Sequence, residues 1–270
     1  MTAQREETTR MGLASQLAHI VEESFDTPHL LRPPDPRHLS EGPRTRQDAV
    51  VFDAVCLYID VNGSSDILNA LGRQDGARFF RALALGAAAV TTANGGHVCG
   101  VHGDAVLAFF TGPHRALRAA STARQVDTYA SDTLDPRLRA RLGRNRTALR
   151  RGLGFSVGCG MDIGPVFAVP VDAGGVRDRI WSGRCVNTAA KLSKVPRQRR
   201  PLAVTAEVLD SIEAESEHHS DRPPPDYWSP ETTVHTAGAM RRVRFGGQPP
   251  GERKEAPLGL ERRVPTPVVP

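Results

Sequence analysis

The sequence predicts one α/β domain built on a single β-sheet, and three observations carry this prediction. Apolar, β-branched runs that fit strands alternate with stretches of helical periodicity. Two of the apolar runs are separated only by Gly103 and Asp104, which predicts a β-hairpin. The elements follow the order strand, helix, strand, strand, helix, strand, which is that of the ferredoxin-like βαββαβ sandwich.

The first half of this domain is expected to hold a long strand, two helices and the hairpin. Strand alternation places Tyr58 and Asp60 on the same face of the first strand. The Gly95–Gly96 pair predicts the turn that precedes the hairpin. The expected elements are a strand at Val50–Val61, helices at Ser64–Leu71 and Asp75–Asn94, and hairpin strands at His97–His102 and Ala105–Phe110.

The second half is expected to repeat the alternation of helix and strand. If all helices cover one face of the sheet, the other face needs a cover, and a second copy of the chain is the natural candidate. We therefore expect a homodimer. The expected elements are a helix at residues 113–134, strands at Phe155–Met161 and Pro165–Val171, a helix at Cys185–Lys194, a strand at Pro201–Thr205 and a helix at Ala206–Ile212.

Both ends of the chain differ in composition from this domain. The apolar residues within residues 11–25 fall near one helical face, which predicts a short amphipathic helix. Prolines predict a linker after it, and a Pro- and Arg-rich tail is expected to be largely irregular, with a short strand at Met240–Phe245. The predicted division is residues 1–45 for the helix and linker, 46–215 for the domain and 216–270 for the tail.

Composition and charge limit the classes of function. The chain has 270 residues, 39% hydrophobic and 24% charged, which is ordinary for a globular protein. Much of the net charge of +5 comes from the arginine-rich segment 137–151. Because no aromatic residues are interleaved there to stack on bases, we interpret it as a solvated helix face and expect no nucleic-acid partner.

Hydropathy and cysteine spacing indicate the compartment. No stretch approaches the roughly 20 apolar residues of a membrane span, and the first ten residues contain no apolar signal core. The four cysteines are scattered and form no C-x-x-C pair, which favours buried free thiols in a reducing environment. We therefore expect a cytosolic protein with no membrane partner.

Two aspartates are the candidate metal ligands. Asp60 lies at the end of the first strand, and Asp104 lies at the hairpin turn, so both carboxylates are expected at the edges of apolar runs. Carboxylates there are costly without a cation between them, and hard oxygen ligands suit divalent ions that hold a triphosphate. Gly63 and Ser64 follow the first strand, where Ser64 or Ser65 can cap the next helix and free backbone N–H groups suit phosphate oxygens.

These motifs resemble the catalytic domain of class III nucleotide cyclases. The resemblance rests on Asp60 with Val61 and Gly63, on the G-G-x-V segment from Gly95 and on G-D-x-x-L-A-F-F from Gly103. It extends to G-M-D-I-G-P-V-F (160–167), G-R-C-V-N-T-A-A-K-L (183–192) and P-L-A-V-T-A-E-V-L (201–209), and so covers about residues 50–212.

The resemblance implies a role for each matched residue. Asp60, Asp104 and the backbone carbonyl of Val61 would bind two divalent ions, Mn²⁺ or Mg²⁺, that hold a nucleoside triphosphate. Asn187 would position the ribose, and Lys191 would stabilise charge on the phosphorus where the family usually has arginine. Lysine keeps the charge but loses the bidentate fork. In the family these two groups come from the partner subunit, which implies a homodimer with two composite sites.

Three departures from the family concern the residues that would recognise the base of the nucleotide substrate. Purine cyclases usually have a base-reading lysine where this chain has Gly100, and a second polar reader where it has Ile180. Tyr58 stands where the family mostly has phenylalanine, although a core aromatic with its hydroxyl at the edge is an equally good structural interpretation. The combination resembles the pyrimidine cyclases of the Pycsar anti-phage systems.

The resemblance therefore implies a uridylate cyclase that converts UTP to 3′,5′-cyclic UMP and diphosphate. The product would be an anti-phage signal for a separate effector protein. A cytidylate cyclase acting on CTP is the close alternative, followed by an adenylate or guanylate cyclase with altered base contacts. The alternative of another class is a non-catalytic cyclase-homology module that binds nucleotide or dimerises.

Overall fold

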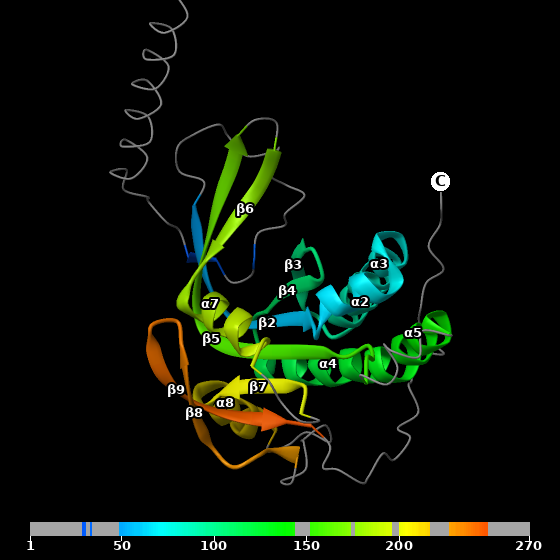
Figure 1. Ribbon diagram of the computed structural model, residues 1–270. Helices are drawn as coiled ribbons and strands as arrows, with labels where there is room; N and C mark the ends of the chain where they lie inside the picture. Colours follow the sequence, from blue (N-terminus) through cyan, green and yellow to red (C-terminus); the bar gives the residue numbers. More distant parts are fainter. Residues whose placement is uncertain are drawn as a thin grey trace, which may run out of the picture.

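A computed structural model describes residues 29–30, 33, 49–143, 152–173, 176–195, 200–216 and 227–247 (Figure 1). The helix predicted at residues 11–25, most of the linker and the last part of the tail lie outside the described residues. None of the helices in these ranges combines the length and the apolar character that crossing a membrane requires. The predicted mixed α/β fold is confirmed.

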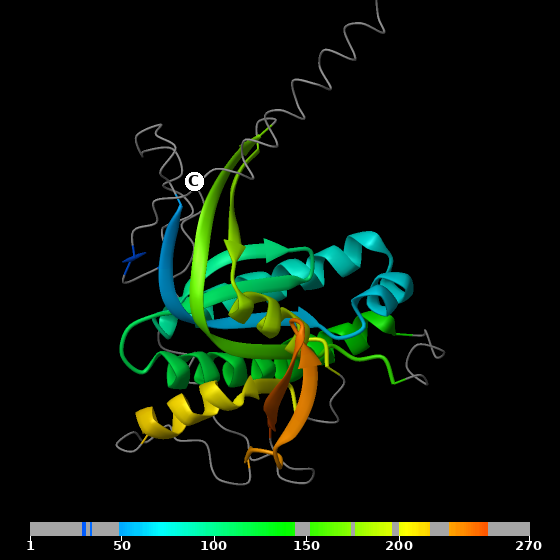
Figure 2. The same ribbon diagram turned by 90° about the vertical axis from the view of Figure 1, so that its left-hand side faces the viewer.

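One sheet runs through the described part of the chain, with β2 and β5 near its centre. β2 pairs antiparallel with β4 on one side, and with β5 on the other. β5 forms a hairpin with β6 that projects from the body of the domain (Figure 2). The strand order is β3–β4–β2–β5–β7–β9–β8, with β1 on β2 and β6 on β5. The strands are β1 (His29–Leu30), β2 (Val50–Val61), β3 (His97–His102), β4 (Ala105–Phe110), β5 (Val157–Ala173), β6 (Val176–Ser182), β7 (Leu202–Thr205), β8 (Thr232–Thr236) and β9 (Ala239–Gly246).

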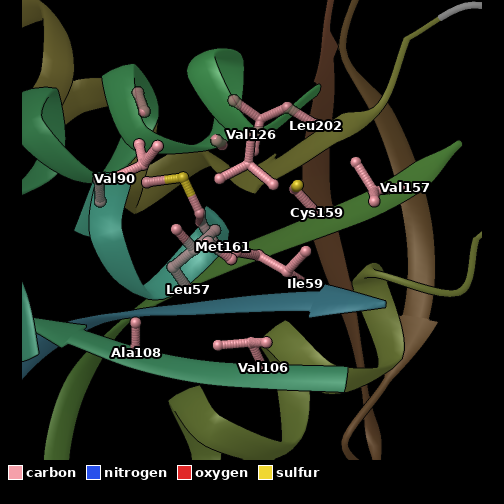
Figure 3. Close-up of a cluster of buried hydrophobic side chains, with 14 of the residues drawn as sticks. Leu57, Ile59, Val90, Val106, Ala108, Val126, Val157, Cys159, Met161 and Leu202 are labelled. Atoms are coloured by element: carbon pink, nitrogen blue, oxygen red, sulfur yellow. The ribbon is translucent and has the colours of Figure 1, made fainter. Parts of the chain in front are cut away.

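Most helices cover one face of this sheet and form the larger core. Figure 3 shows part of it, where Leu57 and Ile59 of β2 and Met161 of β5 meet side chains from the helices. Alternation along β2 places these apolar residues opposite the face that carries Tyr58 and Asp60. The helices that contribute buried side chains to this core are α2 (Ser64–Leu71), α3 (Arg73–Ala93), α4 (Arg115–Tyr129), the π-helix at Ala130–Leu134, α5 (Asp135–Leu142) and α8 (Ala206–Ser216).

The other face of the sheet carries helix α7 (Arg184–Leu192), so the prediction that helices cover only one face is wrong. Cys185, Val186 and Ala189 of α7 join a smaller core on this face. Trp181 of β6 packs edge-on against Phe52 and donates a hydrogen bond from Nε1 to the Cys99 carbonyl oxygen, at 3.0 Å. All four cysteines are buried thiols outside any disulfide, as expected, and burial raises the pKa of the Cys185 thiol to about 12.

Two glycines of β5 explain how closely α7 packs on the sheet. A Cβ atom at Gly158 would overlap the Ser193 carbonyl oxygen. A Cβ atom at Gly160 would overlap the Ala189 carbonyl oxygen and lie 2.6 Å from the Ser193 nitrogen. Because both glycines lack side chains on this face, the backbone of α7 rests directly on β5.

The first half of the domain has the elements that we predicted, whereas the second half differs. The strand β2, the helix α2 and both hairpin strands have the predicted bounds. The helix predicted at residues 113–134 is α4 followed by a π-helix at Ala130–Leu134. The two strands predicted on either side of Gly164 are one strand, because β5 continues through Pro165, opposite Asp53.

The expected irregular tail is wrong for residues 227–247. β8 and β9 form a hairpin there, and β9 pairs antiparallel with β7, so the sheet continues beyond residue 215. β9 covers the short strand that we expected at Met240–Phe245, and Val243 packs with Leu192 and Ala203. The three-part division of the whole chain stays a prediction.

Replacing Gly160 by alanine is expected to destabilise the protein by about 1–3 kcal/mol, because the new methyl group meets backbone atoms of α7 that cannot rotate away. Urea unfolding followed by circular dichroism measures this loss. The control is Gly154→Ala, whose methyl group would first meet the side-chain ends of Asp135 and Arg139 rather than backbone atoms. An equal effect of the two substitutions would contradict the close packing of α7 on β5.

Candidate active site

The structure brings the two candidate metal ligands together at the C-terminal end of β2. Asp60 is the penultimate residue of β2, and Asp104 follows Gly103 at the turn between β3 and β4. Gly103 has a φ of 64°, which supplies the left-handed turn that returns the chain into β4. Ile59 pairs with Val106, so the hairpin turn lies beside the end of β2.

The electrostatics of Asp60 reflect this proximity. Burial raises the pKa of the Asp60 carboxyl, the Asp104 carboxylate raises it further, and Lys194 lowers it in part. The side chain of Asp60 is only 15% exposed. Two carboxylates that share a partly buried location favour a cation between them.

Tyr58 lies on the same face of β2, two residues before Asp60. Its phenol is partly buried, and burial raises the pKa of the phenol, with further contributions from Asp60 and Asp104. The phenol therefore keeps its proton at neutral pH and can donate a hydrogen bond beside the two carboxylates.

The turn after β2 places the N-terminus of α2 at the same end of the strand. Gly63 adopts a left-handed conformation, with φ 66°, and occupies the N-cap position of α2 without a side-chain hydrogen bond. The prediction that Ser64 or Ser65 caps this helix is therefore wrong, since α2 begins at Ser64 itself. The first backbone N–H groups of a helix have no partner within it, so those of Ser64 and Ser65 suit phosphate oxygens.

A cavity of about 590 Å³ opens between α2, α3 and the hairpin turn. Ser64 and Asp104 both line it, so the start of α2 and the hairpin turn can act on one bound molecule. The other lining residues include Gly103, the cation Arg81 and the apolar Leu68, Phe80 and Val101.

The remaining predicted residues lie on α7. Asn187 and Lys191 are both exposed, one helical turn apart on the outer face of the helix. Lys194 lies just beyond α7, and its Nζ is 3.8 Å from Oδ2 of Asp60 in the same chain. Our sequence reasoning missed Lys194, although the spacing 187, 191, 194 places it on the same helical face.

The residues at the end of β2 are of the types that can bind divalent ions. Val61 ends β2 with a buried side chain, so its backbone carbonyl is the group it can offer beside Asp60. Within the described ranges, no three His, Cys, Asp or Glu side chains are grouped so that they could hold a metal ion. The candidate donors are two carboxylates and a carbonyl, hard oxygen ligands of the kind that Mg²⁺ and Mn²⁺ accept.

Curated relatives are named for one activity, although no family model matches the chain. The chain is 29% identical over 151 residues to a protein of Xanthomonas perforans named uridylate cyclase, a match that covers 56% of this chain and 63% of that protein. It is 26% identical over 225 residues to a protein of Burkholderia cepacia with the same name, covering 82% of this chain and 92% of that protein. The chain thus spans less than two thirds of the Xanthomonas relative.

Solved structures show the fold. A bacterial light-regulated adenylyl cyclase superposes with a TM-score of 0.59 at 16% identity, covering 90% of this chain and 64% of that one. An adenylyl cyclase from P. aeruginosa superposes with a TM-score of 0.55 at 14% identity, covering 75% of this chain and 97% of that one. The predicted resemblance to class III nucleotide cyclases is confirmed.

Proposed function

We propose that this chain, which has the fold of class III nucleotide cyclases, is itself a nucleotide cyclase whose substrate is a pyrimidine nucleoside triphosphate, UTP in preference to CTP. The observation that carries the proposal is the convergence of Asp60 and Asp104 beside Tyr58 and the start of α2. The names of the curated relatives support the choice of uridylate.

Asp60, Asp104 and the Val61 carbonyl would hold two divalent ions, Mn²⁺ or Mg²⁺. Bound there, the ions would neutralise the triphosphate and favour ionisation of the ribose 3′-OH. The backbone N–H groups of Ser64 and Ser65 would bind phosphate oxygens. In the reaction the 3′ oxygen loses its proton and forms a bond to the α-phosphorus, while the bond from that phosphorus to the bridging oxygen breaks and diphosphate leaves.

The proposed enzyme is a homodimer that completes each site with Asn187 and Lys191 of the other subunit. Both side chains are exposed on α7, where a second chain can reach them. The projecting β5–β6 hairpin also exposes two large apolar residues on one face, Phe167 at 41% and Ile180 at 55%. A second copy that covers this face would bury them, which favours association.

The proposed base preference rests on Gly100, Ile180 and Tyr58. Gly100 has no side chain and Ile180 has no polar group, so neither position can read the edge of a purine by hydrogen bonding. Tyr58 supplies a protonated hydroxyl on the face that carries Asp60. A phenol can donate or accept, so it serves uracil or cytosine, and the preference for UTP rests on the relatives.

The biological role follows from the resemblance alone. We propose that cyclic UMP made by this enzyme is an anti-phage signal in the cytosol and is read by a separate effector protein. Mass spectrometry of nucleotides from infected and uninfected cells that express the chain tests this role. Equal cyclic UMP before and after infection would contradict it.

Turnover with all four nucleoside triphosphates tests the proposed activity. We expect kcat/KM to be highest for UTP, with CTP next, and ATP and GTP well below. Tyr58→Phe should lower kcat/KM for UTP by about 2- to 13-fold, because one hydrogen bond to the substrate is lost. The affinity for the metal should change less, since no metal ligand is removed.

Other outcomes of this assay would change the substrate assignment or the class of protein. A clear preference for ATP or GTP would contradict the pyrimidine assignment but leave a cyclase. A reversed order of UTP and CTP would identify a cytidylate cyclase. No cyclic product from any triphosphate, with nucleotide binding retained, would identify a non-catalytic module.

A further inference from the structure

Lys194 makes an ion pair with Asp60 that the proposed reaction does not explain. Its Nζ lies 3.8 Å from Oδ2 of Asp60, and the two residues belong to one chain. The lysine side chain is 67% exposed, whereas the aspartate side chain is 15% exposed. The ammonium group is therefore free to leave, while the carboxylate stays in place.

The close packing of α7 explains why Lys194 reaches this position. Gly158 of β5 is the cross-strand partner of Asp60, and the Ser193 carbonyl oxygen rests on Gly158. The chain therefore leaves α7 directly beside Asp60, and the next residue along is Lys194. Neither the lysine nor the aspartate needs to move far for the pair to form.

The surroundings of this pair are negative. The C-terminal end of a helix carries partial negative charge, and that end of α7 approaches Asp60. Asp104 adds a second carboxylate: burial raises the pKa of Asp60, Asp104 raises it further, and Lys194 lowers it only in part. One ammonium group thus offsets only part of the charge at the site.

We propose that Lys194 is a tethered counter-ion that pairs with Asp60 while no divalent ion is bound and gives way when one binds. This inference rests on the proposed role of Asp60 as a metal ligand. A divalent ion carries twice the charge of the ammonium group and contacts both carboxylates, so it displaces the lysine. The affinity for the metal is then lower than it would be without Lys194. Before the metal binds, Lys194 holds the Asp60 carboxylate in place at the end of β2.

The competition predicts that removing the charge of Lys194 tightens metal binding. Exposed ion pairs are weak and screened by salt, so we expect Lys194→Met to bind Mn²⁺ about two- to fivefold more tightly. The gain should shrink as the salt concentration rises. Lys194→Arg keeps the charge and should remain close to the wild type.

The experiment titrates Mn²⁺ into the full chain without nucleotide and follows free Mn²⁺ by electron paramagnetic resonance. Arg184→Met is the matched control, because it removes one exposed positive charge from the start of the same helix, about 15 Å from Lys194 by the helical rise. We expect it to leave the Mn²⁺ affinity within error of the wild type. Asp104→Ala should weaken binding strongly and so identifies the site that is titrated.

Two results would overturn the inference in different ways. If Asp104→Ala loses Mn²⁺ but Lys194→Met binds it as the wild type does, or more weakly, Lys194 does not compete with the metal, and the proposed metal site stands. If Asp104→Ala binds Mn²⁺ as well as the wild type, the metal site itself is wrong, and both the proposed function and this inference fail.

Discussion

Replacing either Asp60 or Asp104 by alanine is expected to lower the formation of cyclic product to background, a loss of more than about a hundredfold. Each substitution removes one of the two carboxylates that converge beside Tyr58. The remaining carboxylate and the Val61 carbonyl would not hold both ions, so the triphosphate would be neither neutralised nor fixed for in-line attack, and phosphoryl transfer depends on both effects. Product formed from UTP with Mn²⁺ or Mg²⁺ is the measurement.

The fold should survive these substitutions, which makes the result interpretable. The pKa of Asp60 is raised in the folded protein, so its ionised form is less favourable there than in the unfolded chain at neutral pH. Removing that charge should therefore leave the urea midpoint unchanged or slightly higher. Asp210→Ala, which removes an exposed carboxylate from α8, is the control and should retain activity. Near wild-type turnover of Asp60→Ala or Asp104→Ala would show that the metal assignment is wrong.

The part of the site on β2 and the hairpin could be predicted because its signals are local. Alternation along β2 placed Tyr58 and Asp60 on one face, and the Gly103–Asp104 pair identified the turn. These features depend on residues one or two positions apart, so no knowledge of tertiary packing is needed. The bounds of β2, β3 and β4 agree with the structure for the same reason.

The features that were missed depend on contacts between distant segments. α7 lies on the second face of the sheet because Gly158 and Gly160 leave room for its backbone, and a glycine in a sequence does not say which segment approaches it. The ion pair of Lys194 with Asp60 joins residues 134 positions apart (194 − 60) and follows from that packing. A short strand was predicted at Met240–Phe245, within β9, but its pairing with β7, which extends the sheet, joins distant segments and was missed.

Mixing the inactive variants Asp104→Ala and Asn187→Ala is expected to restore about a quarter of wild-type activity. In the proposed homodimer each site takes its aspartates from one subunit and Asn187 from the other. A heterodimer of the two variants therefore has one intact site and one site with both defects. Random exchange makes about half of the dimers heterodimers, each with one of two sites active, and exclusive heterodimer formation would give about half of wild-type activity.

The exposed position of Asn187 makes this experiment decisive, because its substitution on the outer face of α7 should not disturb the core that Cys185 and Ala189 form beneath it. Differently tagged subunits, co-purified after mixing, verify that exchange has taken place. Mixing Asp60→Ala with Asp104→Ala is the control and should restore nothing, because each site of that heterodimer lacks one aspartate. Verified exchange without any rescue would show that the sites are not shared between subunits.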